Sequence, residues 1–209
     1  MAEFILKKAK ETDDCGADRM FGSPNVCDDF VWPVATDKYG NESDMMFLCQ
    51  VSCSSIESEY LPDDGILYFF YDALNCPSTP NIKDGAKVIL YTGDRSSLSQ
   101  MRLVDENGND VSPDAYMMLP AEQGIVSILP PDDEEFEDEE LYGEYEGEYG
   151  DEESDAMSPD DDSIVLAAFS EFEDENVSFN FENGTCLYFL ISRKAFENGD
   201  LSDIRVFVA

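Results

Sequence analysis

Short apolar runs separated by polar turns are the main pattern along this chain. The runs are rich in aromatic and β-branched residues, and turn signals such as Pro62-Asp-Asp-Gly65 and Asn107-Gly108 stand between them. This pattern is typical of β-strands joined by tight turns. We predict a strand in the first dozen residues and further strands over 47–51, 65–71, 86–91, 102–104, 125–129, 164–169, 177–181, 185–191 and 204–208.

Helix signals are few. Residues 54–57 (Ser-Ser-Ile-Glu) can cap a short helix that reaches Tyr60. Residues 192–196 can form another, which ends at Asn198-Gly199. The sequence therefore predicts an α+β fold, a mostly antiparallel β-sheet scaffold with a few short helices.

Two of the predicted strands resemble each other. Gly65-Ile-Leu-Tyr-Phe-Phe-Tyr71 matches Gly184-Thr-Cys-Leu-Tyr-Phe-Leu-Ile191 once one residue is inserted. An old internal duplication explains the match, and so does the frequency of aromatic strands that follow a glycine.

Charge divides the chain into segments. The 209 residues hold 48 acidic and 12 basic side chains, which gives a net charge of −36. Residues 132–162 contain 18 acids and no base, so the remaining 178 residues keep 30 acids and 12 bases, or −18. Like charges at such density oppose folding. We therefore predict a single domain, formed by residues 1–131 and 163–209, and a disordered acidic insertion over 132–162.

The composition also excludes several classes of function. A strongly acidic protein is poorly suited to bind nucleic acid or anionic membranes. The chain has no histidine, so histidine-based triads, general bases and metal sites are excluded. No apolar run is long enough for a signal peptide or a membrane helix, and we expect a cytoplasmic protein with reduced, mostly buried cysteines.

No motif indicates an enzyme, a cofactor or a metal site. Residues 105–110 resemble the start of a calcium loop, but Asp110 stands where that loop needs glycine, and Tyr116 stands where it needs glutamate. A hairpin turn is the better interpretation of this segment. Carboxylates are so numerous that a catalytic pair of them has no diagnostic value without geometry.

Four blocks in the chain resemble the YwqG-like proteins, a bacterial family of unknown function. They are Gly16-Ala-Asp-Arg-Met-Phe-Gly22-Ser-Pro24 with Phe30-Val-Trp32-Pro33, Phe47-Leu-Cys-Gln50, Leu61-Pro62 with 65–72, and 184–204. The resemblance implies a sheet scaffold and marks as family-motif positions Gly22, Pro24, Trp32, Pro33, Gln50, Gly65, Phe69, Gly184 and Phe189. The family's paired glycines and its central segment have no clear counterpart here.

Two of these positions allow two interpretations. Trp32, the only tryptophan, is either a core anchor or a platform for a ligand. Gln50 either satisfies buried backbone groups or contacts a ligand.

The resulting hypothesis is a non-enzymatic binding protein, in its most concrete version an immunity-type protein that neutralises a basic toxin. The candidate partner-binding residues are the aromatic side chains of the acidic insertion, Phe136, Tyr142, Tyr145 and Tyr149, because aromatic anchors and negative charge suit a basic protein. The insertion could equally be a spacer, and the acidity a salt adaptation. The alternative function is an enzyme or small-ligand protein with carboxylates in a sheet-lined cleft, and a weaker one is a divalent-cation buffer.

Overall fold

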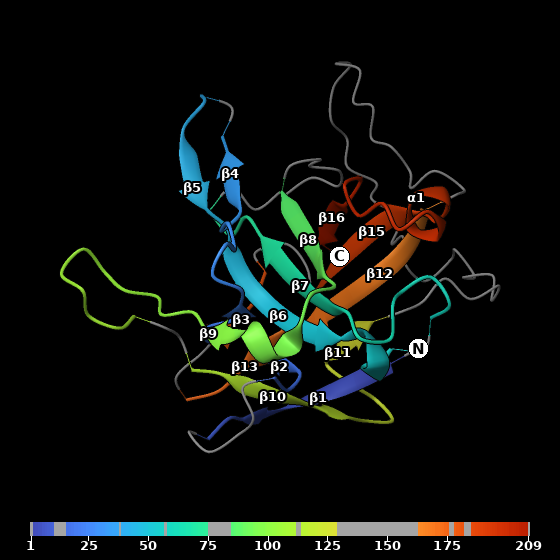
Figure 1. Cartoon of the computed structure of the whole chain (residues 1–209), viewed down its shortest axis with the longest axis horizontal. Helices are drawn as coiled ribbons and strands as arrows, with labels where there is room; N and C mark the ends of the chain where they lie inside the picture. The colour runs from blue at the N-terminus through green and yellow to red at the C-terminus, as the bar shows by residue number, and fades with distance from the viewer. Residues whose placement is uncertain are drawn as a thin grey trace.

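The structure is a computed structural model that describes residues 2–10, 16–37, 39–56, 58–74, 85–111, 114–128, 163–175, 178–181 and 185–208 (Figure 1). Its main element is a ten-stranded sheet in which neighbouring strands are antiparallel. From one end to the other the strands are β16 (Arg205–Val208), β15 (Cys186–Ser192), β12 (Ser163–Ser170), β11 (Val126–Ile128), β1 (Ala2–Lys8), β10 (Tyr116–Pro120), β2 (Arg19–Met20), β6 (Met46–Ser52), β7 (Ile66–Tyr71) and β8 (Ala86–Tyr91).

Short elements complete the part of the chain that the structure describes. Three ribbons of two strands accompany the sheet: β3 (Asn25–Val26) with β9 (Ser99–Gln100), β4 (Val34–Thr36) with β5 (Glu42–Asp44), and β13 (Phe172–Glu173) with β14 (Ser178–Phe179). The helical elements are α1 (Arg193–Glu197) and the 3-10 turns η1 (Cys53–Ser55) and η2 (Arg95–Ser97). No helix among the described residues has the length and apolar character needed to cross a membrane.

The predicted α+β class is wrong, because the chain is nearly all β with α1 as its one α-helix in the described residues. The helix expected over 54–60 is reduced to η1, since Ile56 returns to an extended backbone (φ −120°, ψ 124°) and is buried. Burial of a β-branched side chain has overridden a local capping signal. The helix expected at 192–196 is confirmed as α1, where the hydroxyl of Ser192 accepts a hydrogen bond from the backbone N–H of Ala195.

The predicted strands are largely present, with two differences. Residues 102–104 form no strand, although Val104 makes an isolated antiparallel bridge to Asp110. Of the strand expected over 177–181, only the two residues of β14 remain in the described chain.

The sheet curls until its two ends face each other across one core, and it is nearly closed. The ring of Phe69 on β7 lies 5.7 Å from that of Phe169 on β12 and 5.3 Å from that of Phe189 on β15, measured between centroids. These strands belong to opposite ends of the sheet. Edge-to-face aromatic contacts of this kind add to the free energy gained by burying apolar area. A single core therefore holds both ends of the sheet together.

The two halves of the sheet have the same strand arrangement. Read inward from either end, the order is β8-β7-β6-β2-β10 or β16-β15-β12-β11-β1. The β6–β7 pairing has an irregularity that leaves out Leu48, and the β12–β15 pairing has one that leaves out Leu166. Directly after each irregularity, the partner is a phenylalanine at the matching position of the two similar strands. Cys49 pairs with Phe69, and Ala167 pairs with Phe189.

The first strand of each half is exchanged with the other half. β1, the first strand of the chain, pairs with β11, whereas β10 pairs with β2. β1 and β10 then pair with each other at the centre of the sheet. The structure thus relates the two similar sequences by their places in the sheet, while their common ancestry remains a prediction.

A second apolar layer covers the outer face of the first half. Outward-facing side chains of β6 and β7, such as Phe47, Tyr68 and Phe70, are buried in a cluster separate from the main core. Residues that pack on this face include Phe30 and Trp32 from the connection between β2 and β6, and also Leu98 and Met101. All six residues of β7 are buried as a result.

Candidate functional site

The first family-motif block forms a tight turn at the end of β2. Gly22 has a positive φ of +69°, and a Cβ at this position would lie 2.6 Å from the Cβ of Ala115. Phe21, which precedes it, also has a positive φ of 57° and is buried. The carbonyl of Pro24 accepts a hydrogen bond from the N–H of Met101 at 2.9 Å. This turn therefore needs glycine at position 22 and directs the chain onto the outer face of the sheet.

Trp32 and Pro33 hold the base of the β4–β5 hairpin. The indole N–H of Trp32 donates to the carbonyl of Met45 at 2.9 Å, and the N–H of Met45 donates to the carbonyl of Pro33 at 3.0 Å. The indole ring meets the ring of Phe70 edge-on at 5.1 Å. This position anchors the covering layer on the sheet.

Gln50 connects the sheet to the same layer. Its side-chain oxygen accepts from the N–H of Asn25 at 2.8 Å, and its amide nitrogen donates to the carbonyl of Ala17 at 3.2 Å. The side chain is 1% exposed. Both bonds go to backbone groups, one of them on the buried Asn25, so the geometry favours a structural role over contact with a ligand.

The remaining family-motif positions lie in the core or outside the described residues. At Gly65 a Cβ would lie 2.8 Å from the Sγ of Cys53, so the close approach of η1 requires glycine. Phe69 and Phe189 form the aromatic contact between the two ends of the sheet. Gly184 lies outside the described residues.

A polar network surrounds η1. The carboxylate of Asp18 accepts from the N–H of Ser52 at 2.8 Å and from the hydroxyl of Ser55. The guanidinium of Arg95 donates to the hydroxyl of Ser52 at 2.7 Å and to the carbonyls of Asp64 and Gly65. These bonds fix the turn. A serine beside an aspartate resembles part of a catalytic triad, but the chain has no histidine to transfer the proton.

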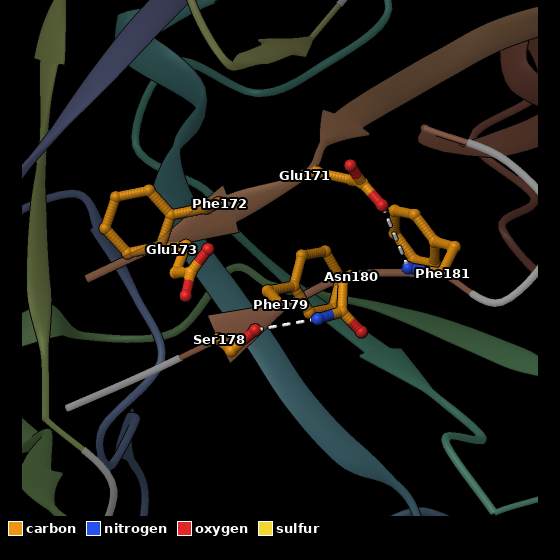
Figure 2. Close-up of a pocket in the computed structure, with 7 residues that line it drawn as sticks. All are labelled: Glu171, Phe172, Glu173, Ser178, Phe179, Asn180 and Phe181. Atoms are coloured by element: carbon orange, nitrogen blue, oxygen red, sulfur yellow. Dashed lines mark hydrogen bonds between the residues drawn. The ribbon is translucent and has the colours of Figure 1, made fainter. Parts of the chain in front are cut away.

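The hollow drawn in Figure 2 lies at the β13–β14 ribbon and has a volume of about 440 Å³. Its lining comprises Glu171, Phe172, Glu173, Ser178, Phe179, Asn180 and Phe181. Phe179 and Phe181 are buried and meet each other edge-on at 4.9 Å, so their rings belong to the core.

The polar groups of this hollow face solvent. Glu171 and Glu173 are exposed, and a carboxylate oxygen of Glu171 accepts the N–H of Phe181 at 3.4 Å (Figure 2). The amide of Asn180 donates to the hydroxyl of Ser178 at 2.7 Å. An exposed pair of carboxylates lacks the desolvation that a general acid needs.

Shifts in carboxyl pKa do not mark an acid–base site either. Hydrogen bonds from a residue two or four positions later lower the pKa of four aspartates in turns. They are Asp37, Asp94, Asp105 and Asp200. Hydrogen bonds to the ionised form have this effect. Among the described residues, the shifted carboxyl groups are thus stronger acids than usual, whereas a catalytic acid near neutral pH needs the opposite shift.

The cysteines within the described ranges are buried or partly buried thiols. Cys27, Cys49, Cys53 and Cys186 are free. Burial raises the pKa of Cys49 and raises that of Cys53 to about 11. A thiol with a raised pKa is a poor nucleophile and a poor metal ligand at neutral pH. Within the same ranges, no three acidic or cysteine side chains gather as a metal site would require.

The predicted partner-binding residues Phe136, Tyr142, Tyr145 and Tyr149 lie outside the described residues. Sequence reasoning predicted the turn at Asn107-Gly108 but missed its similarity to a second turn, at the tip of the β4–β5 hairpin. Residues 37–41 (Asp-Lys-Tyr-Gly-Asn) and 105–109 (Asp-Glu-Asn-Gly-Asn) share the pattern Asp-x-x-Gly-Asn. This repeat was a signal that could have revealed the similarity.

The two tips have the same hydrogen bonds. In the first tip the N–H of Asp37 donates to the carbonyl of Asn41, and in the second the N–H of Asp105 donates to the carbonyl of Asn109. In both tips the backbone N–H and the side-chain amide of the asparagine donate to the aspartate carboxylate. The glycines have φ values of +84° and +81°. The turn predicted at Asn107-Gly108 is therefore confirmed, with the isolated bridge between Val104 and Asp110 in place of flanking strands, and the tip of β4–β5 is its counterpart.

Comparison with known proteins gives a family but no activity. No curated protein matches the chain. The sequence model of a family described as a domain of unknown function (DUF1963) matches residues 19–208, most of the chain, and this protein therefore belongs to that family.

Proposed function

We propose that this protein is a non-enzymatic binding protein of the YwqG-like group, and that its partner is a basic protein. The observation that carries the proposal is the placement of its acids. Among the described aspartates and glutamates, Asp72 alone is buried, with 6% of its surface exposed. The negative charge of the folded part therefore faces solvent, where it can steer a basic partner into encounter.

The most specific form of the proposal is an immunity-type protein that neutralises a basic toxin. A folded acidic surface complements a cationic toxin, and tight inhibition needs no catalytic group on the inhibitor. The absence of histidine and the exposed position of the carboxylates at the hollow in Figure 2 both fit an inhibitor better than an acid–base enzyme.

Co-expression tests the immunity version. Cells that produce a basic toxin encoded beside this gene should survive when this protein is also produced. Growth arrest despite soluble expression of both proteins would contradict the immunity version.

Calorimetry on the purified pair tests the role of charge. The affinity of the complex should fall as sodium chloride rises, because salt screens exposed charges. A complex with an affinity independent of salt would contradict a partnership based on charge.

A chain lacking residues 132–162 then locates the site. This deletion removes half of the net charge, from −36 to −18. A partner lost only with the deletion would place the site on the acidic segment and its four aromatic residues. A partner kept by the deleted chain would place the site on the folded part.

A further inference from the structure

The exposed apolar side chains of the described chain are concentrated in two places. Eight large hydrophobic residues are exposed, and five of them lie on two segments that we name the arms. Arm 1 is residues 28–44 and arm 2 is residues 102–111. The five are Val31, Val34, Tyr39, Val104 and Val111, with exposed fractions from 50% to 80%. Isolated exposed hydrophobics are ordinary, whereas several on the same short segment favour that segment as an interaction site.

Both arms project from the layer that covers the outer face of the first half. Pairing of β3 with β9 joins the segments from which they extend. Trp32 at the base of arm 1 and Met101 beside arm 2 pack on the same cluster. In Figure 1 the β4–β5 hairpin and the loop after β9 both extend beyond the sheet in the left half of the view, the hairpin upward and the loop to the left.

The arms are held in shape before any partner arrives. Each tip is closed by the same set of bonds to one aspartate, Asp37 or Asp105. The base of arm 1 is fixed by the bond from the indole of Trp32 to Met45. A surface that is already ordered loses less conformational entropy on binding than a flexible one.

The charge on the arms selects the class of partner. Exposed acids accompany the apolar side chains on both arms: Asp28, Asp29, Glu42 and Asp44 on arm 1, and Glu106 and Asp110 on arm 2. The aspartates of the two tips, Asp37 and Asp105, are half-buried. Two copies of so acidic a surface repel each other, and nucleic acid and anionic membranes are repelled for the same reason. A basic surface that also offers apolar contacts is the complementary occupant.

The geometry points to the two arms as the surface that docks the basic protein partner, with Val31, Val34 and Tyr39 as its apolar anchors. This inference rests on the proposed function and adds the location of the binding site for the basic partner. The anchors supply contact area, and the flanking acids supply charge complementarity and register.

Matched triple variants test the apolar anchors. One variant carries Val31→Ser, Val34→Ser and Tyr39→Ser. Its control carries Ile5→Ser, Leu74→Ser and Leu119→Ser, the three exposed hydrophobics outside the arms. Circular dichroism shows that each variant folds. The probes are a peptide of alternating lysine and valine and an oligolysine peptide of equal charge, and calorimetry measures their affinity.

The arm variant should bind the lysine–valine peptide about tenfold more weakly, a loss of about 1.4 kcal/mol. Its affinity for oligolysine should be unchanged, and so should the affinity of the control variant for both peptides. Equal losses in the arm and control variants would overturn the arms as the site while leaving a basic partner in place. No binding of either peptide to the unmodified chain would overturn the proposed function as well.

A second pair of variants tests the charges. Glu42→Gln, Asp44→Asn and Glu106→Gln remove three charges from the arms, and Glu171→Gln, Glu173→Gln and Glu197→Gln remove three exposed charges elsewhere. The first set should lower the affinity for the lysine–valine peptide more than the second set does. Equal effects would overturn the location.

In a chain lacking residues 132–162, the arm charge variant should still bind the lysine–valine peptide more weakly than the other charge variant does. Equal affinities of the two variants in the deleted chain would assign the charge effect to the acidic segment and overturn the role of the arms. Sedimentation that showed self-association abolished by Tyr39→Ser would instead identify a second copy as the occupant, and would also overturn the inference.

Discussion

The two halves of the sheet share their strand order and register but differ in what their connections build. In the first half, the connection between β2 and β6 forms the covering layer and the β4–β5 hairpin. The equivalent connection in the second half, between β11 and β12, contains the acidic segment 132–162. Strand pairing constrains the sheet closely, whereas surface connections are free to diverge and to acquire function. Arm 1 and the acidic segment thus occupy the same topological place, whereas arm 2 belongs to the connection between β9 and β10.

Side chains on the two faces of the sheet reflect this difference. Positions that face the shared core match in the two halves, as with Leu48 and Leu166. The outer position of Gln50 corresponds to Ala168. Gln50 has a covering backbone group to bond, the N–H of Asn25, and this bond accounts for a polar side chain at that position. Side chains that face the shared core are thus similar in the two halves, whereas side chains on each outer face suit the segment that packs against it.

The largest effect should come from breaking the core that joins the halves. We expect Phe69→Ala and Phe189→Ala each to lower the free energy of unfolding by about 3–5 kcal/mol, because each leaves a cavity among fully buried rings. Urea denaturation followed by circular dichroism measures the loss. A loss in one variant below half of that in the other would show that the two positions are not equivalent.

A second comparison concerns glycines with positive φ inside and outside the packed turn. Gly22→Ala should cost about 2–4 kcal/mol, because alanine at φ +69° is strained and its Cβ would meet Ala115. Gly40→Ala is the control, since φ is +84° there and nothing lies within 4 Å of the added Cβ. It should cost about 1 kcal/mol. Equal shifts in melting temperature would show that the close approach to Ala115 contributes little.

A smaller effect is expected for the covering layer of the first half. Trp32→Phe removes the hydrogen bond to the carbonyl of Met45 and should lower the free energy of unfolding by about 1–2 kcal/mol. Val31→Ala, at an exposed position of the same arm, should leave the stability unchanged. A stability of Trp32→Phe equal to that of the unmodified protein would mean that the layer does not depend on this bond.

The smallest effect concerns ionisation at the two hairpin tips. Hydrogen bonds from Asn41 and Asn109 lower the pKa of Asp37 and Asp105. Asn41→Ala should raise the pKa of Asp37 toward its ordinary value and leave that of Asp105 unchanged. Asn109→Ala should do the reverse, and carbon-detected NMR titration measures both.

The sign of the accompanying stability change follows from the direction of the shift. A carboxyl group with a lower pKa in the folded state stabilises the turn above the unfolded pKa, about 3.9. That contribution disappears as the pH falls through the folded pKa. The single variants should therefore differ from the unmodified chain near neutral pH and converge with it in acid. A difference that persisted in acid would show that the asparagines act by another route.

The strands were predictable because alternation and aromatic content act over a few residues. Ile66–Tyr71 and Cys186–Ser192 were recognised from such local patterns, and so was the capped turn of α1 at Ser192. The helix expected after Ser54 failed because the burial of Ile56 depends on distant partners. Of the candidate site, the family-motif residues were predictable by resemblance, whereas the arms were missed because exposure is not encoded in any short window.

The sequence alone determined most of the long strands, although not the central strand β10. It also determined the division of the charge and the exclusion of histidine chemistry, because these depend on residue type and short-range periodicity. Only the tertiary structure decided that Phe69 meets Phe189, that β1 and β10 are exchanged between halves, and that Val31, Tyr39 and Val104 remain exposed on the two arms. Each of these depends on contacts between residues far apart in the chain, and the closure of the sheet around one core sets all of them at once.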